Sequence, residues 1–247
     1  MSINLASPGN VAEPEGFRLV VYDLDGTLFE TLPDLQAAAN LALAERGHPA
    51  ADQVRMRQAI GDGARSLIHR LLGLDTPQAE VDLVLERFQH HYLRLCCDRS
   101  RPREGAVDFL KRRASDFPGR LQAVLSNKPQ SPTDRLVRHH GMDAWIGRSI
   151  GGDTSWGRKP QTSGLLELMR WAGVDAGRTL VIGDGPADLA VAKAAGVRSV
   201  RLDGGYGEKS ALDVLPCTWR AGSFAELETL WVWIEPDSTF RIATASH

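Results

Sequence analysis

Residues 17–27 read FRLVVYDLDGT, a short apolar run with adjacent valines that ends in the acidic pair Asp23 and Asp25. Near-continuous apolar character, in place of alternation, is typical of a strand covered on both faces of a parallel sheet. In such α/β sheets, ligands gather outside the carboxyl ends of the strands. The two acidic residues therefore stand where a functional site is expected.

Three further apolar runs follow the same pattern: Leu121–Leu125, Thr179–Ile182 and the weaker Val197–Leu202. Helical patterns lie between the runs, at Val107–Ala114, Pro132–His140, Ser163–Ala172 and Ala187–Ala195. This repetition of strand and helix predicts an α/β fold with a Rossmann-like, doubly wound parallel sheet.

The segment from Pro33 to Asp98 departs from this alternation, because it carries helical patterns and no convincing strand. Pro33 suits a first helical turn, a second helix is expected within Gln58–Leu72, and a long third helix is expected after Pro77. A block of this length exceeds a normal crossover connection. The expected organisation is an α/β core at 16–32 and 99–235, an inserted helical domain at 33–98, and loose tails at 1–15 and 236–247.

The composition of the 247-residue chain excludes several functional classes. It has 43% hydrophobic and 24% charged residues, which is typical of a soluble globular protein. A net charge of -2 and 6% aromatic residues argue against nucleic acid or an anionic membrane as a partner. No apolar run approaches the ~20 residues that span a bilayer, and Met1–Gly16 is too polar for a signal peptide. The three cysteines have no Cys-x-x-Cys spacing, which argues against a disulfide framework or a zinc site. A cytoplasmic location is therefore expected.

Chemically active side chains stand next to three of the apolar runs. They are Asp23 and Asp25 after the first, Ser126 and Asn127 after the second, Asp184 and Asp188 after the third, and Lys159 shortly before the third. Crowded carboxylates repel one another unless a cation lies among them, and oxygen ligands without His or Cys favour Mg²⁺. We expect Asp23 and Asp184 to hold Mg²⁺, with Asp188 either as a direct ligand or as a supporting group.

This set of residues suits phosphoryl transfer, which needs a nucleophile, a cation, donors for the phosphoryl oxygens and an acid for the leaving group. Asp23 is expected to attack phosphorus and form an aspartyl-phosphate. Asp25 is expected to protonate the leaving alcohol and then to activate water. Ser126 and Lys159 would hold phosphate oxygens, together with backbone N–H groups after Asp23.

The same residues resemble the four motifs of the haloacid dehalogenase-like phosphatase superfamily, over about residues 17–230. The motifs are Asp23–Leu28, Ser126-Asn127-Lys128, Lys159-Pro160, and Gly183-Asp184 with Asp188, in the family's order and spacing. The resemblance implies that Asp23 is the nucleophile and Asp25 the acid and base. It also implies that the Asp23 carboxylate, the Asp25 backbone carbonyl and Asp184 bind Mg²⁺, and that the helical insertion is a cap. The full expected phosphate-binding set is Thr27, Ser126, Asn127 and Lys159.

More narrowly, Ala59–Gly63, Gly151-Gly152-Asp153 and Gly204–Gly207 resemble segments of phosphoglycolate phosphatases. The chain departs from the wider family at Glu30-Thr31, where Asp-Ser is common, and at Gly185, where Ser or Thr is usual. These departures leave the catalytic residues intact.

The glycines of Gly61-Asp62-Gly63 precede a helix whose free N–H groups suit a substrate carboxylate. Arg65 adds positive charge in the same turn, so we expect Gly61, Gly63 and Arg65 to contact the substrate. The alternative is a glycine-capped helix with a solvent-facing Arg65.

Together these features predict a Mg²⁺-dependent phosphatase that hydrolyses a small phosphorylated metabolite, with 2-phosphoglycolate as the expected substrate. A phosphosugar mutase of the same fold is the first alternative, and it would return the phosphoryl group to its substrate. A non-catalytic phosphometabolite-binding protein is a second. A dehalogenase would need neither Mg²⁺ nor the second acid, Asp25.

Overall fold

The computed structural model describes residues 16–117 and 119–234. Its core is a six-stranded parallel sheet in the order β5-β4-β1-β6-β7-β8. The strands are β1 (Leu19–Tyr22), β4 (Leu121–Leu125), β5 (Arg148–Ile150), β6 (Thr179–Gly183), β7 (Arg198–Leu202) and β8 (Trp219–Ala221). Strand β1 lies between β4 and β6, at the point where the strand order reverses. The predicted Rossmann-like, doubly wound α/β core is confirmed.

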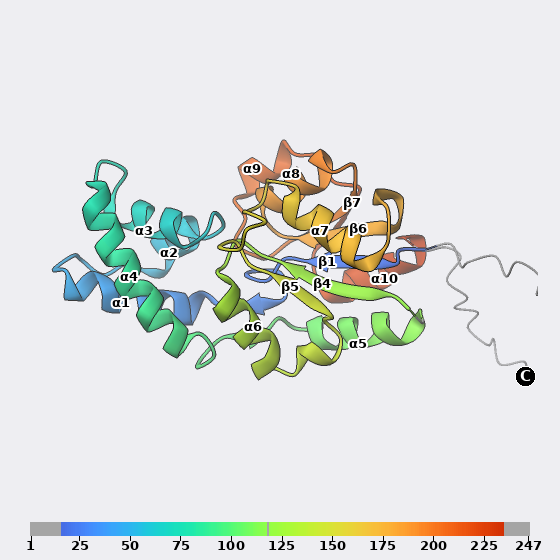
Figure 1. Cartoon of the computed structure of the whole chain (residues 1–247), viewed down its shortest axis with the longest axis horizontal. Helices are drawn as coiled ribbons and strands as arrows, with labels where there is room; N and C mark the ends of the chain where they lie inside the picture. The colour runs from blue at the N-terminus through green and yellow to red at the C-terminus, as the bar shows by residue number, and fades with distance from the viewer. Residues whose placement is uncertain (1–15, 118, 235–247) are drawn as a thin grey trace, which may run out of the picture.

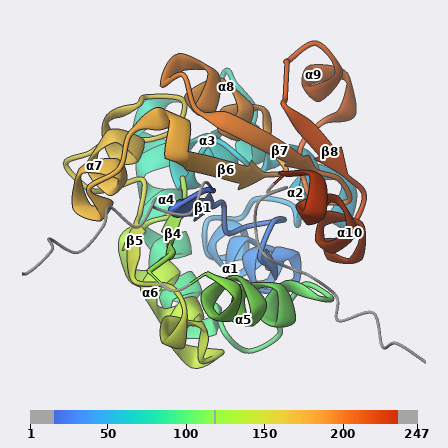
Figure 2. The same cartoon turned by 90° about the vertical axis from the view of Figure 1, so that its right-hand side faces the viewer.

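Helices cover both faces of this sheet (Figure 2). The core helices are α5 (Ala106–Asp116), α6 (Gln130–His139), α7 (Ser163–Ala172), α8 (Pro186–Ala194), α9 (Lys209–Asp213) and α10 (Phe224–Ile234). Leu19 and Val21 of β1 belong to the apolar cluster under α7 and α8, whereas Val20 and Tyr22 belong to the cluster with α5, α6 and α10. Successive side chains of a strand point to opposite faces. A strand with both faces buried therefore reads as a continuous apolar run.

A second group of helices lies beside the sheet, at the left of Figure 1. It consists of α1 (Leu32–Glu45), α2 (Gln53–Ala59), α3 (Ala64–Leu72) and α4 (Gln78–Leu95). The short antiparallel strands β2 (Phe29–Glu30) and β3 (Arg101–Pro102) pair at the two points where the chain enters and leaves this group. We propose that residues 33–98 form the cap, as the sequence predicts; below, "cap" denotes helices α1–α4 and their connections.

The four strands predicted from apolar runs are all present, but the structure contains elements that the sequence reading did not include. Strands β5 and β8 have three residues each, too short to give an apolar pattern. Helix α2 is separate from α3, because Ile60–Gly63 breaks the chain between them, with Gly61 at φ +129° and Gly63 at φ +89°. Such angles are accessible to glycine at little cost.

The predicted loose tails, 1–15 and 236–247, lie outside the described residues. Across the part of the chain that is described, no helix combines the length and the apolar character needed to cross a bilayer.

Candidate active site

The carboxyl ends of β1, β4 and β6 open into a cavity of about 720 Å³. This volume lies in the range of sites for small ligands. Seven predicted site residues of the core line it together: Asp23, Asp25, Ser126, Asn127, Lys159, Asp184 and Asp188. Residues of α2, α3, α4 and the α2–α3 connection line the opposite wall. The cavity therefore lies between the core and the cap.

Asp23 directly follows β1 and is almost fully buried. Lys159 Nζ donates to Asp23 Oδ1 at 2.5 Å and to Asp188 Oδ1 at 2.6 Å. Among the described residues, Lys159 is the only side chain that bonds to the Asp23 carboxylate, so Asp23 Oδ2 stays available. Burial raises the pKa of Asp23 well above its usual range, and the charge of Lys159 opposes this rise. Burial alone would lower the pKa of Lys159, but Asp188 and Asp23 hold that pKa above its ordinary value.

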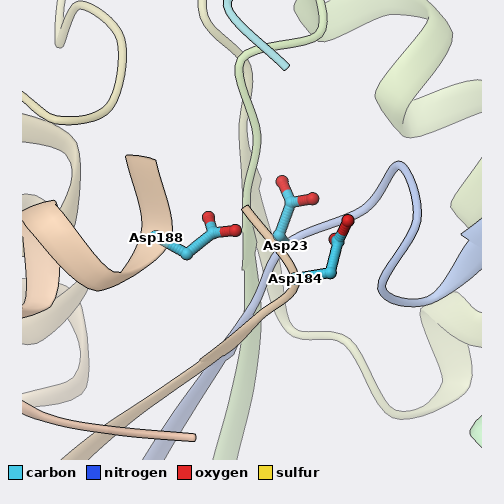
Figure 3. A group of neighbouring side chains, drawn as sticks. All are labelled: Asp23, Asp184 and Asp188. Carbon is cyan, nitrogen blue, oxygen red and sulfur yellow. The ribbon is translucent and has the colours of Figure 1, made fainter. Parts of the chain in front are cut away.

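Asp184 and Asp188 complete an acidic cluster with Asp23 (Figure 3). One carboxylate oxygen from each residue lies within 4.8 Å of the others. Burial and then repulsion from Asp188 raise the pKa of Asp184 to about 6. Hydrogen bonds from Thr27 Oγ1 and from two backbone N–H groups limit this rise.

The donor set of this cluster fits a divalent cation. Three buried carboxylates with one lysine leave a surplus of negative charge, and such a surplus is costly away from water. All the donors are hard oxygen atoms, which suit Mg²⁺ better than zinc or copper. Asp23 and Asp184 can offer ligand oxygens there. Asp188 is already bound at both oxygens, by Lys159 and by the Gly185 N–H at 2.9 Å.

Asp25 lies two residues beyond Asp23 and is bound by a residue to which the sequence reading gave no role. Lys128 Nζ donates to both Asp25 oxygens at 2.8 Å. Thr31 Oγ1 adds a third hydrogen bond at 2.6 Å. The Lys128 ammonium also lies 4.5 Å from the centre of the Tyr92 ring in α4. The sequence signal for Lys128 is its place directly after Ser126 and Asn127 in the second motif. A residue at the carboxyl end of that strand lies at the same edge of the sheet as Asp25.

Ser126 and Asn127 follow β4 and are both buried. Ser126 Oγ lies at the cavity wall and accepts a hydrogen bond from the Lys128 N–H at 3.3 Å. Asn127 Nδ2 donates to the backbone oxygens of Gly61 at 3.0 Å and Lys159 at 3.1 Å. Asn127 therefore joins the core to the cap connection, in addition to lining the cavity.

Thr27 is placed differently from expectation. Its hydroxyl donates to Asp184 Oδ1 at 2.5 Å, and its side chain is buried outside the cavity lining. The side chain therefore orients an acidic residue and is not positioned to bind phosphate. The expectation came with the family resemblance; in the structure, Thr27 follows the turn at Gly26 (φ +87°) and its hydroxyl binds Asp184.

The cap residues divide into two groups. Gly61 and Gly63 line the cavity, as expected. Arg65 does not line it: its guanidinium pairs with Asp82 of α4, on the exposed side of the cap. The solvent-facing alternative holds for Arg65, because the turn that begins α3 directs residue 65 away from the wall that Gly61 and Gly63 form. The cap arginines that line the cavity are Arg57 and Arg70.

Comparison with known families agrees with this geometry. The profile of the family described as haloacid dehalogenase-like hydrolase matches residues 17–196, which include Asp23, Lys159 and Asp184. The chain belongs to the haloacid dehalogenase-like hydrolase family. Its sequence motifs and its fold thus lead to the same family.

Curated relatives of this hydrolase are named phosphoglycolate phosphatase. The Mesorhizobium japonicum protein is 35% identical over 203 residues, covering 80% of this chain and 88% of its own length. Phosphoglycolate phosphatase 1 of Pseudomonas aeruginosa is 34% identical, covering 83% and 80%. A crystal structure of a predicted phosphoglycolate phosphatase from Haemophilus somnus superposes with a TM-score of 0.79 at 26% identity, covering 87% of this chain and 98% of that one. The predicted enzyme class, a phosphoric monoester hydrolase, is confirmed.

Tyr206 connects the acidic cluster of this hydrolase to the entry of the cap. Its N–H donates to Asp184 Oδ2 at 2.7 Å. Its hydroxyl accepts from the N–H groups of Thr31 at 2.7 Å and Leu32 at 2.9 Å and donates to Glu30 at 2.8 Å. A Cβ at Gly205 would overlap the Asp184 carboxylate, so glycine is needed for this approach. The sequence marks Gly204–Gly207 only by its resemblance to phosphoglycolate phosphatases, because a sequence pattern does not show which hydrogen bonds form.

We expect Tyr206→Phe to lower the free energy of unfolding by about 1–3 kcal/mol, because the N–H groups of Thr31 and Leu32 lose their acceptor in a buried place. Urea denaturation measures this change. Tyr92→Phe is the matched control, since the buried Tyr92 hydroxyl has no partner among the described residues. Equal losses for the two variants would contradict the role given to the Tyr206 hydroxyl.

Proposed function

We propose that the protein is a Mg²⁺-dependent phosphatase that hydrolyses 2-phosphoglycolate through an aspartyl-phosphate on Asp23. The observation that carries this proposal is the Asp23 carboxylate, which has one oxygen bound to Lys159 and the other available at a cavity shared with Asp25. A nucleophile needs an unshared oxygen at the substrate, and an acid–base group within the same cavity.

In the first step, Asp23 Oδ2 attacks the phosphorus atom. The bond from phosphorus to the leaving oxygen breaks, and Asp25 gives a proton to that oxygen. Lys159 neutralises negative charge next to Asp23, and Ser126 lies at the wall where a donor to a phosphoryl oxygen is needed. The products of this step are the alcohol, glycolate, and the aspartyl-phosphate.

In the second step, a water molecule attacks the phosphorus of the aspartyl-phosphate. Asp25 accepts a proton from this water, the bond from phosphorus to Asp23 Oδ2 breaks, and inorganic phosphate leaves. Lys128 and Thr31 orient the Asp25 carboxylate through this cycle, since they bond to its oxygens at 2.6–2.8 Å.

Asp23, Asp184 and the backbone carbonyl of Asp25 would hold Mg²⁺. The ion supplies neutralising charge for the phosphoryl group and for the acidic cluster. We assign Asp188 a supporting role, because it holds Lys159 and the start of α8. Asp184 accepts hydrogen bonds only from neutral donors among the described residues, whereas Asp188 pairs with the Lys159 ammonium through one oxygen and binds the Gly185 N–H through the other. This difference favours a supporting role for Asp188 over direct ligation.

The substrate assignment is supported by the relatives named phosphoglycolate phosphatase, at 31–35% identity. It is tested by incubating the full-length protein with Mg²⁺ and 2-phosphoglycolate and measuring inorganic phosphate. We expect kcat/KM to exceed that for glycerol 3-phosphate by about tenfold or more.

The outcomes of this assay separate the alternatives. Phosphate release from both esters without a preference would reject 2-phosphoglycolate as the specific substrate. A rearranged phosphate ester without free phosphate would indicate a mutase. Tight binding without turnover would indicate a binding protein, and full activity in EDTA would reject the need for Mg²⁺.

A further inference from the structure

Four cationic side chains line the cavity: Arg57, Arg70, Lys128 and Lys159. Three of them bind carboxylates of this chain. Lys159 pairs with Asp23 and Asp188, Lys128 with Asp25, and Arg70 with Asp62. Arg57 is the exception, because none of the described residues offers it a carboxylate.

The position of Arg57 is defined by the loop that follows β7. Its Nη1 donates to the backbone oxygen of Gly205 at 2.9 Å, and its guanidinium lies 5.2 Å from the centre of the Tyr206 ring. A guanidinium has five N–H donors in a planar fork that fits a carboxylate. Only one of these donors is used within the described residues. Glu208, which also lines the cavity, accepts a hydrogen bond from Ser210.

The neighbouring cap wall is apolar. Leu35, Ile60, Leu67 and Phe88 line it, and Leu35, Leu67 and Phe88 are buried. An electrostatic contact beside apolar side chains is worth more than one in bulk water. Arg57 is thus a half-buried cation with unused donors, and it reaches from the cap to the loop that contacts Asp184.

We propose that Arg57 is the residue that selects substrates whose leaving group carries a carboxylate. This inference rests on the proposed phosphatase function. The phosphoryl group occupies the core end of the cavity, at Asp23 and Lys159, and the carboxylate at the other end of the molecule binds the free donors of Arg57. Tyr206 and Gly205 hold the guanidinium in position, and the same loop contacts Asp184. One segment would therefore position the groups that bind both ends of the substrate.

The test compares three phosphate esters of similar size that differ in the charge of their tail. They are 2-phosphoglycolate with a carboxylate, ethyl phosphate with a neutral methyl group, and phosphoethanolamine with an ammonium group. We expect Arg57→Gln to reduce the ratio of kcat/KM for 2-phosphoglycolate over ethyl phosphate by about 10- to 100-fold, the range of a hydrogen bond to a charged group. Arg57→Lys should restore part of this ratio, and Arg57→Glu should shift the preference toward phosphoethanolamine.

Arg65→Gln is the matched control, since Arg65 lies on the same cap but pairs with Asp82 away from the cavity. It should leave both the ratio and the rates unchanged. If Arg57 only supports the Tyr206 loop, Arg57→Gln will slow all three esters equally and keep the ratio, which overturns the proposal.

A binding measurement separates this inference from the proposed function. Calorimetry of 2-phosphoglycolate on the Asp23→Asn protein with Mg²⁺ should show a Kd that rises about tenfold or more when Arg57→Gln is added. An unchanged Kd overturns the role of Arg57. A wild-type protein that releases no phosphate from any of the three esters overturns the phosphatase function instead, whatever the calorimetry shows.

Discussion

Asp23→Asn is expected to abolish turnover, with kcat lower by about 10⁴-fold or more, as for the loss of other enzymatic nucleophiles. An amide oxygen is a poor nucleophile at phosphorus, and no acyl-phosphate can form on an intact asparagine. The fold should survive, because Asn has nearly the same shape as Asp and Lys159 keeps its contact with Asp188 at 2.6 Å. The variant therefore tests the chemical step in a protein whose fold is unchanged.

Two measurements check this expectation. Inorganic phosphate release gives the rate, and mass spectrometry of the acid-quenched wild-type protein should find phosphate on the peptide that contains Asp23. The matched control is Asp108→Asn, which makes the same chemical change at an exposed position in α5. If Asp23→Asn turned over substrate while mass spectrometry excluded deamidation, another residue would have to be the nucleophile.

Removal of Mg²⁺ should have the second large effect, a loss of activity by about 10²- to 10³-fold or more that added Mg²⁺ reverses. Neutralisation of a phosphoryl group by a metal ion lowers the activation barrier by several kcal/mol, and each ~1.4 kcal/mol changes the rate tenfold. The structural cause is the acidic cluster, in which one carboxylate oxygen of each of three aspartates lies within 4.8 Å of the others. With the ion removed, neither the substrate charge nor the cluster charge is neutralised.

A thermal melt tests the same site without a substrate. At ~100 times its Kd, a ligand of the native state stabilises it by about 2.7 kcal/mol, which for a chain of this size is a rise in Tm of roughly 5–10 °C. Asp184→Asn should remove most of this rise, and Asp108→Asn should keep it. NaCl of equal ionic strength serves as the salt control. A Tm that does not respond to Mg²⁺ would reject the predicted metal site.

The pH dependence of this melt follows from Asp184, whose pKa is raised to about 6 by burial and by Asp188. A carboxylate with a raised pKa in the folded state stabilises the metal-free protein below its unfolded value near 4, and this stability is lost as the pH rises through about 6. Mg²⁺ binds the ionised form. The rise in Tm with Mg²⁺ should therefore be full above pH 7 and decrease toward pH 5.

The sequence was sufficient for four of the six core strands, β1, β4, β6 and β7, and for the polar residues at the carboxyl ends of β1, β4 and β6. A strand buried on both faces must be apolar along its length, and the polar residue that follows it must lie at the sheet edge, as Asp23, Ser126 and Asp184 do. Both features depend only on the strand and on the residue that follows it. The local sequence is therefore enough to predict them, whichever strands lie alongside.

Tertiary structure alone decided which cap cations line the cavity and what holds each acidic side chain. Arg57 and Arg65 are both arginines next to Gly61-Asp62-Gly63, yet only Arg57 lines the cavity. Lys128 on Asp25, Thr27 on Asp184 and the Tyr206 hydroxyl at the cap entry are contacts between segments distant in sequence or across a turn. Residue type and periodicity indicate how buried a position is. The partner of a side chain depends on how segments distant in sequence pack against one another, and that geometry exists only in the folded chain.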